Sequence, residues 1–379
     1  MAGKIFITGD THGKLHKFNT TKFPQQKNLD KEDFMIICGD FGLVWSVNQE
    51  MRENREEIWW LDWLERLPFT VLFVDGNHEN FDRLNKYPVE EWHGGKVHKI
   101  RPSVIHLMRG QVFEIASKKI FTFGGAASHD VSDGILEPDD PKLREKIKEL
   151  NKRRAMFRVN HVSWWKEELP SEEELEEGWS NLAKHGNKVD YIISHCCPGQ
   201  VQKLIDQQLD EQNELTAYFD SVRLSVEYNK WYFGHYHQDK TITNKEVLLY
   251  HRIIELGEEV DDMTPVLGKP RYELYQPVKF TAHMGKEPKE KIGVVVIRDP
   301  YGTWSDPDEP SYDIFARIDG ELASLYSKDV CLFKHHPEST VRALTEEEIK
   351  ENAELISYIS TRWGKKEERL KKKNDESQQ

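Results

Sequence analysis

The sequence predicts an α/β fold over about its first 260 residues and a smaller β-rich part after it. Short apolar runs rich in β-branched and aromatic residues alternate with segments of helical spacing, and each run ends at Gly or Asp. The first three runs are residues 4–8, 34–38 and 70–74. A chain of 379 residues is also long for one compact domain, which favours one large domain with a smaller one.

The segment between the second and third runs predicts a β-α-β crossover. Residues 49–67 place Ile58, Leu61 and Leu64 at helical spacing, and a helix there makes the flanking strands parallel. Ligands usually bind at the carboxyl ends of such strands. Further strands are expected at residues 119–123, 189–193 and 231–233.

The charged stretch 138–184 is expected to be a solvated helical insert. Ser171 and Glu174 have the spacing of a capping box, which predicts a helix that begins after Pro170. The tryptophans of this stretch are expected to pack in the core rather than to border a substrate cleft. They are Trp164, Trp165 and Trp179.

The character of the sequence changes after about residue 260. A linker at 267–270 precedes short strands, separated by turn residues, that predict a small barrel-like or sandwich module over 270–343. These strands are expected at 272–280, 292–298, 312–317 and 330–334, with turns at 300–302 and 306–308. Thr345 and Glu348 form a second capping box for a terminal helix over 345–363, and the polar tail 364–379 is expected to be disordered.

Composition narrows the function and the location. The formal net charge of -13 argues against broad electrostatic attachment to nucleic acid, although it says nothing about the charge inside one pocket. The apolar runs are too short to cross a membrane and the N-terminus lacks the pattern of a secretory signal. Four cysteines, two of them adjacent, argue against a disulfide framework as the basis of the fold. Reduced thiols fit the cytoplasm, so a cytoplasmic protein without membrane attachment is expected.

Five short segments carry the chemistry, and each follows a predicted strand. Side chains at positions i and i+2 beyond a strand end can converge on one ion, and mixed carboxylate, imidazole and amide ligands suit first-row divalent metals. The segments are Gly9-Asp10-Thr11-His12-Gly13, Gly39-Asp40-Phe41-Gly42, Gly76-Asn77-His78-Glu79, Ser194-His195-Cys196-Cys197 and Gly234-His235-Tyr236-His237.

In this order the segments resemble the signature of the calcineurin-like metallophosphoesterases, D-x-H, G-D, G-N-H-[DE], H and G-H-x-H, over about residues 1–255. The resemblance implies a four-layer α/β/β/α sandwich over 1–260 and a dinuclear metal centre. It implies that Asp10, His12 and His237 hold one metal, and that Asp40 bridges to a second metal. Asn77, His195 and His235 are then the ligands of that second metal. The C-terminal part resembles no family that we recognise.

The resemblance also implies a role for His78 as the residue that contacts the phosphate and protonates the leaving oxygen. Two cations can neutralise a phosphate and turn a bound water into an attacking hydroxide, while a positioned imidazole eases departure of the alkoxide. Glu79 is expected to orient His78 or a metal ligand. Manganese is the first choice for the two divalent ions, with iron, zinc, nickel and magnesium as alternatives.

One motif departs from the family pattern. The second segment usually reads G-D-x-x-D and in protein phosphatases continues with an Arg that grips phosphate, whereas this chain has Leu43-Val44-Trp45. The departure disfavours a phosphoprotein substrate, unless Arg52, Arg55 or Arg83 reaches the pocket by another route.

Other candidates have simpler interpretations. Residues 124–130 form a Gly-rich turn that can bring His129 or Asp130 to the rim of the cleft. Cys196 and Cys197 are expected to be packed rather than catalytic. The histidines of the segment 334–337 are expected at the surface.

The function predicted from these residues is hydrolysis of a phosphomonoester or phosphodiester. A nuclease that acts on DNA or RNA is the main alternative, with a protein phosphatase or a non-catalytic scaffold as weaker ones. A nuclease needs a basic, aromatic-lined track near the metals, and a nucleotide hydrolase needs a closed pocket. The sequence leaves open the substrate, the native metals, the oligomeric state, the protein partners and the role of the C-terminal module.

Overall fold

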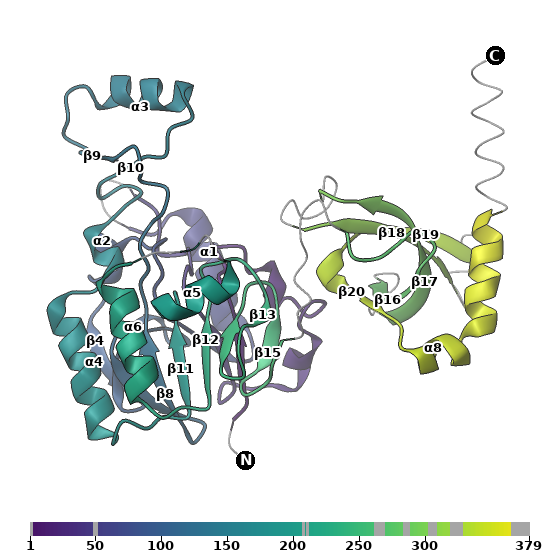
Figure 1. The fold of residues 1–379 in the computed structure, drawn as a ribbon, viewed down its shortest axis with the longest axis horizontal. Coiled ribbons are helices and arrows are strands. Elements are labelled where there is room, and N and C mark those ends of the chain that lie inside the picture. Colours follow the sequence, from purple (N-terminus) through teal and green to yellow (C-terminus); the bar gives the residue numbers. More distant parts are fainter. Residues whose placement is uncertain are drawn as a thin grey trace. The chain divides into compact units, whose positions relative to one another are not determined.

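A computed structural model describes residues 3–47, 52–206, 209, 212–260, 270–282, 289–301, 309–318 and 329–364. The chain divides into two compact units, Met1–Met263 and Thr264–Gln379 (Figure 1). The finer division that the sequence predicts, into 1–260, 270–343 and 345–363, stays a prediction. The expected disordered tail lies outside the described residues beyond Gly364, as do residues 267–269 of the expected linker and residues 302 and 306–308 of the expected turns.

The first unit contains a seven-stranded sheet of mixed direction, with the order β15-β1-β2-β3-β6-β5-β4. Strands β1, β2, β3 and β6 are parallel, as the crossover in the sequence predicts, while β15, β5 and β4 are antiparallel to their neighbours. The bounds are β1 Ile5–Thr8, β2 Phe34–Ile37, β3 Thr70–Phe73, β4 Val89–Trp92, β5 Gly95–Arg101, β6 Val104–Leu107 and β15 Ile253–Glu255.

A six-stranded sheet of order β13-β14-β12-β11-β8-β7 completes the sandwich. Its centre is parallel, since β11 pairs with both β8 and β12 in that direction and β12 pairs likewise with β14. The bounds are β7 Gln111–Ile115, β8 Lys118–Phe123, β11 Tyr191–Ser194, β12 Lys230–Phe233, β13 Lys240–Thr241 and β14 Glu246–Leu248. The strands predicted from the sequence in this unit are thus present, each within two residues of its expected start.

Three apolar clusters define the layers. One cluster lies between the two sheets and takes side chains from both, including Ile7, Ile36, Ile193 and Tyr232. The outer faces are covered by helices, with Leu61 and Leu64 of α1 (Arg55–Arg66) on the first sheet. Helices α4 (Glu172–Lys184), α5 (Gly199–Ile205) and α6 (Glu214–Ser225) cover the second sheet (Figure 1). This order of layers confirms the predicted α/β/β/α sandwich.

Helix caps explain where the helices begin. The side chain of Asn54 accepts hydrogen bonds from the backbone N–H groups of Glu56 and Glu57 in a capping box, so α1 begins at Arg55. The sequence predicted a helical segment from about residue 49, and this is wrong for the described residues 52–54, which are not helical. The predicted box of Ser171 and Glu174 is confirmed at α4. The remaining short helices are η1 Leu15–Phe18, η2 Pro24–Asn28, α2 Phe81–Leu84 and η3 Lys166–Glu168.

The expected helical insert is only partly helical. Between β8 and α4, strands β9 (Ile135–Leu136) and β10 (Arg158–Val159) pair in parallel and carry α3 (Leu143–Lys152) on an arm that projects from the sandwich (Figure 1). Trp165 is fully buried and Trp179 packs against Tyr218, which confirms the expected packing role of these two. The half-buried Trp164 instead lines a cavity, and its Nε1 donates to Glu168 at 2.8 Å. The sequence pattern could not predict strands β9 and β10, because a strand of two residues is too short to show an alternation of apolar and polar residues.

The second unit is β-rich, as predicted, with a five-stranded antiparallel sheet of order β19-β18-β17-β16-β20. Helix α8 (Glu346–Glu351) follows the confirmed capping box of Thr345 and Glu348, and residues 353–364 are helical after a turn at Asn352. Trp363 and Ile359 pack on one face of the sheet. The bounds are β16 Pro277–Ala282, β17 Lys289–Asp299, β18 Ser311–Arg317, β19 Val330–Pro337, η4 Glu338–Thr340 and β20 Val341–Ala343.

Two details of the second unit differ from the prediction. Residues 272–276 precede the strand that was expected to include them, because Tyr272 is turned inward and its hydroxyl donates to the carbonyl of Val341. Strand β20 was not predicted. Within the described part of the whole chain, no helix combines the length and apolarity needed to cross a bilayer; the cytoplasmic location stays a prediction.

A buried polar network lies beneath the end of β3. The carboxylate of Asp75 accepts from Arg109 and from His106 Nε2 at 3.1 Å, and His106 Nδ1 lies 3.1 Å from Nδ1 of His98. Since His106 uses its proton toward Asp75, His98 donates to His106 as a neutral ring. Burial, and secondly the nearby His106, lower the pKa of His98 to about 4.

This network predicts acid-sensitive stability. An unfolded histidine titrates near its ordinary pKa of about 6.5, so His98 with its lowered pKa stabilises the fold above that pH and loses the contribution as pH falls toward 4. Between pH 7 and pH 5 the wild type should lose about 2 kcal/mol of unfolding free energy more than His98→Asn. Urea unfolding of both proteins at the two pH values measures this difference, and parallel losses would show that His98 is protonated in the fold.

Candidate metal centre

The five predicted segments lie at the carboxyl ends of five strands. Asp10 and His12 follow β1, Asp40 follows β2, and Asn77 follows β3, all in the first sheet. The remaining predicted ligands follow β11 and β12 of the second sheet; they are His195, His235 and His237. Because both sheets present these ends at the same side of the sandwich, side chains up to 227 positions apart in sequence come together.

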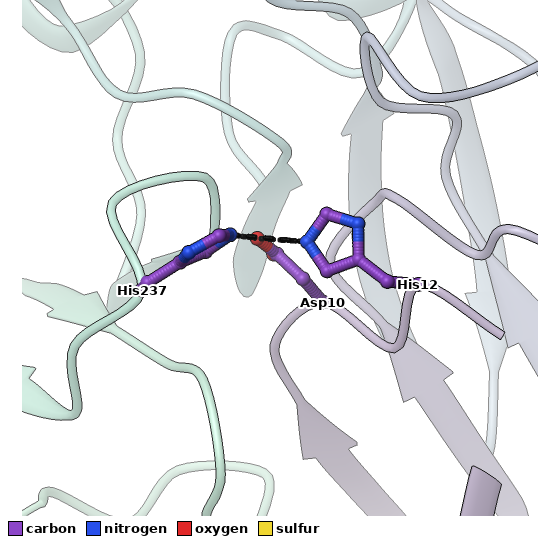
Figure 2. A group of neighbouring side chains, drawn as sticks. All are labelled: Asp10, His12 and His237. Atoms are coloured by element: carbon purple, nitrogen blue, oxygen red, sulfur yellow. Dashed lines mark hydrogen bonds and ion pairs between the residues drawn. The ribbon is translucent and has the colours of Figure 1, made fainter. Parts of the chain in front are cut away.

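Asp10, His12 and His237 form the first group of side chains able to hold a metal ion (Figure 2). The Nε2 atoms of the two histidines are 3.0 Å apart, and the dashed line in Figure 2 joins them across the Asp10 carboxylate. Asp10 Oδ2 lies 3.3 Å from Nε2 of His237 and 3.8 Å from that of His12. Three donor atoms therefore converge on one small volume.

Asp10, Asp40 and His195 form the second group, so Asp10 belongs to both. Nε2 of His195 lies 3.3 Å from Asp40 Oδ1 and 3.2 Å from the side-chain oxygen of Asn77. The other oxygen of Asp40 points to the first group, 3.6 Å from Nε2 of His12. Asp40, like Asp10, thus faces both groups, which is the position required of a bridging ligand.

The hydrogen bonds of His195 show that this donor set suits cations. Its Nδ1 lies 2.8 Å from the carbonyl oxygen of Cys38, which can only accept, so Nδ1 carries the proton. A neutral His195 would direct the lone pair of Nε2 at two oxygens, those of Asp40 and Asn77, so the arrangement requires positive charge there, either a proton on Nε2 or a metal cation among the three atoms.

The charges around His195 also indicate that this site stabilises positive charge. Burial alone lowers the pKa of this imidazole, but the negative charges of Asp40 and Asp10 outweigh it and raise the pKa of His195 to about 10. The pKa of Asp40 is lowered despite its burial, chiefly by His195. The site is therefore a buried field that stabilises positive charge, as a metal centre requires.

His235 completes the second group from its other side. Its ring centroid lies 5.0 Å from that of His195, while its backbone N–H donates to both carboxylate oxygens of Asp10 at 3.0 and 3.1 Å. Burial, and then the neighbouring His195, lower the pKa of His235 to about 3. A neutral imidazole is the form that can donate a lone pair to a metal.

Four of the seven predicted ligands have left-handed backbone. The φ angles are +46° at His12, +43° at Asp40, +69° at His235 and +51° at His237. Residues other than glycine seldom take this conformation, and where they do they cluster at functional sites. The backbone is thus bent to aim these side chains rather than to continue the strands.

Glycines next to the ligands leave room for carboxylates. A Cβ on Gly234 would fall on Oδ1 of Asp10, and one on Gly76 would fall on Oδ1 of Asp40. Each of these glycines belongs to a segment that supplies a ligand, and each touches a ligand of another segment. The Gly in these motifs is therefore a packing requirement of the site.

His78 lies at the edge of the site and is half-buried. Its ring centroid is 5.3 Å from that of His12, and its backbone N–H donates to Asp40 at 2.8 Å. Glu79 does not orient His78: its Oε1 accepts from the backbone N–H of Phe41 at 2.7 Å and so supports the loop that follows Asp40. This hydrogen bond does not meet the expectation that Glu79 orients His78 or a metal ligand.

Two supports of the site were missed in the sequence. The amide of Asn77 donates to the hydroxyl of Ser128 at 3.2 Å, and the buried Glu168 holds this hydroxyl and the Ser128 backbone. Lys17 is half-buried and donates to the carbonyl oxygens of Asp10 and Tyr250. Tyr250 stacks on His237 with ring centroids 4.5 Å apart. Ser128 lies in the Gly-rich turn at residues 124–130, and this turn was the sequence feature that could have indicated a contact with the site.

The other candidates have structural roles. Arg83 does not reach the site as a phosphate ligand, because it is buried and paired with Glu57 at 2.8 Å. His129 lies near the rim, with its ring centroid 6.3 Å from that of His235. Cys196 and Cys197 are buried free thiols. His336, expected at the surface, packs its ring against Phe280 of the second unit.

A sandwich of two sheets with histidines and aspartates gathered at its strand ends defines a metal-dependent phosphoesterase. The chain belongs to the calcineurin-like phosphoesterases, whose family model matches residues 3–239. It is accordingly a hydrolase that acts on phosphoester bonds. The family model does not match the C-terminal part.

Curated relatives narrow the comparison. The chain is 22% identical over 248 residues to lariat debranching enzyme A of Xenopus laevis, covering 62% of this chain and 42% of the relative. It is 23% identical over 215 residues to the lariat debranching enzyme of Caenorhabditis elegans, covering 54% and 39%. For that of Homo sapiens the values are 24% over 144 residues, 35% and 25%. The chain spans less than half the length of these relatives.

The close approach of Gly234 to Asp10 yields a test of the site. In Gly234→Ala the new methyl group should displace the Asp10 carboxylate and weaken manganese binding by about 10- to 100-fold, the range typical of ligand-supporting residues. Calorimetric titration with Mn²⁺ measures this change. Gly364→Ala, whose Cβ would meet open space, is the control. Equal affinity in both variants and the wild type would show that Asp10 is not a ligand.

Proposed function

We propose that the chain hydrolyses a phosphodiester of a nucleic acid at a dinuclear metal centre. The observation that carries the proposal is the convergence of two donor groups, Asp10 with His12 and His237, and Asp10 with Asp40 and His195, each within 4.8 Å. The relatives are named for debranching a lariat, which favours a diester over a monoester.

In this proposal Asp10, His12 and His237 hold one divalent ion, and Asn77, His195 and His235 hold the other. Asp40 bridges them. When bound, two such cations neutralise the phosphate and make hydroxide available from water at neutral pH. Manganese is the first candidate, with iron, zinc, nickel and magnesium as alternatives, since each accepts mixed nitrogen and oxygen ligands.

The protein's own groups then have separate tasks. Cys38 fixes the ring of His195 through its carbonyl oxygen, and the N–H groups of His235 and His78 hold the carboxylates of Asp10 and Asp40. His78 is our candidate for the general acid that protonates the leaving oxygen. Its ring lies beside that of His12, with centroids 5.3 Å apart, and this position supports the role.

Metal dependence and two substitutions test the proposal together. Protein loaded with Mn²⁺ should hydrolyse an aryl phosphodiester, and chelation should stop the reaction. His195→Ala and Asp40→Asn should each lower turnover by at least about 100-fold, because each removes a donor from the shared group.

His185→Ala provides the matched control for these variants. His185 lies at the C-terminal end of α4 and bonds the carbonyl oxygen of Asn181, so its loss should leave turnover unchanged. Circular dichroism checks that all variants are folded. Wild-type turnover in His195→Ala and Asp40→Asn, or active protein free of metal, would refute the metal centre.

The role of His78 is tested through the leaving group. A general acid contributes about 10²- to 10⁴-fold where the leaving oxygen is a poor one. In His78→Ala hydrolysis of an alkyl diester should fall by that factor, while hydrolysis of a nitrophenyl ester, which leaves without a proton, should fall far less. Steady-state rates on both esters measure the ratio, and equal losses would assign His78 to binding alone.

A further inference from the structure

A tryptophan stands at one end of a row of rings that crosses the proposed metal centre. The ring centroid of Trp45 lies 5.9 Å from that of His78, which lies 5.3 Å from that of His12. The row continues to His237 at 5.1 Å from His12, and then to Tyr250, which also neighbours the ring of His251. Trp45 is the member of this row with the largest flat surface.

The backbone of Trp45 is held by buried charge. Its N–H donates to Oε1 of Glu57 at 2.9 Å, and its carbonyl oxygen accepts from the amide of Asn80. Glu57 is itself paired with the buried Arg83 at 2.8 Å. The position of Trp45 is therefore fixed by groups outside the site, and substrate does not have to order it.

The ring of Trp45 is also supported on one side. The fully buried Trp165 meets it nearly edge-on, with centroids 5.7 Å apart and an interplanar angle of 71°. Trp165 is fixed in turn by a hydrogen bond from Nε1 to Asp82 at 2.8 Å. Trp45 also packs against the core under the first sheet, and it is half-buried, so part of the residue stays exposed.

Tyr250, near the other end of the row, is arranged differently. Its ring lies parallel to that of His237 within 16° and 4.5 Å, so one face is covered by a proposed ligand. Trp45 is tilted by 39° from His78 and is not stacked on it. Tyr250 thus supports a ligand, whereas Trp45 offers its surface beside the candidate general acid.

We propose that Trp45 is an aromatic surface on which the substrate stacks a flat heterocyclic base, namely the base of the nucleoside whose sugar oxygen is the leaving group. A rigid indole beside His78 places such a base where the oxygen next to it meets the imidazole. Stacking on an aromatic side chain stabilises a bound base in a way that tolerates its sequence. The inference rests on the proposed function, and it makes Trp45 a residue that determines specificity.

A pair of substrates isolates this role. One is a dinucleotide phosphodiester, and the other is the same diester with an abasic sugar on the leaving side, so the two leaving alcohols match. In Trp45→Ala the value of kcat/KM should fall about 10-fold or more on the dinucleotide, mainly through KM, and stay within about two-fold on the abasic diester. Trp45→Phe should keep most of the preference.

Trp59→Ala is the matched control, because Trp59 on α1 is 56% exposed and has Trp60 as its ring neighbour. It should change neither substrate. Equal losses on both substrates in Trp45→Ala would assign Trp45 to packing and overturn the inference, while the proposed function stands. Failure of the manganese-loaded wild type to hydrolyse either diester would overturn the proposed function and this inference with it.

Discussion

The burial of two like charges at the junction of two sheets governs this structure. Asp10 and Asp40 are each 2% exposed. Burial and the charge of Asp40 act to raise the pKa of Asp10, but the nearby histidines, chiefly His195, outweigh them and lower it. Two carboxylates so placed are unstable unless positive charge and N–H donors surround them. The donors come from both sides of the sandwich, because the N–H of His235, after a strand of the second sheet, binds Asp10 of the first.

The site is thereby also a seam of the fold. His195 of the second sheet donates to the carbonyl oxygen of Cys38 at the end of β2, and its own carbonyl accepts from Gly234. Substituting a residue of this seam affects the packing of the sheets as well as the ions, which is why matched controls matter for every ligand variant. The same coupling explains the tight glycines: Gly234 and Gly76 let a carboxylate from one segment touch the backbone of another.

Much of this arrangement could be predicted from short-range pattern. Parallel strands end at one side of a sheet, so Asp10, Asp40 and Asn77 had to be neighbours once their strands were predicted. That His195 and His237 lie beside these residues was predicted from the resemblance alone, because the apolar pattern of the strands does not indicate how two sheets pack against each other.

The features that the sequence did not predict share a physical cause: they depend on contacts with residues that are distant in the sequence. Glu168 lies in a charged stretch whose composition indicates solvent, yet it is buried because Ser128 and Trp164 satisfy its carboxylate. Lys17 looks like a surface residue until three acceptors surround its ammonium group. The start of α1 was misplaced for a local reason, because the spacing of Ile58, Leu61 and Leu64 does not mark where the helix begins, whereas the capping box of Asn54 does.

The loop after Asp40 explains how the chain manages without the arginine that protein phosphatases of this superfamily place there. Leu43 is 4% exposed and Val44 is fully buried, and both belong to the core under the first sheet. A guanidinium at position 44 would enter that core unpaired, at a large desolvation cost. In the proposed function, positive charge for the phosphate therefore comes from the metal centre, and selectivity comes from the groups on the ester. The next residue of this loop is the half-buried Trp45, which we propose as an aromatic surface for the substrate in place of a guanidinium that binds phosphate.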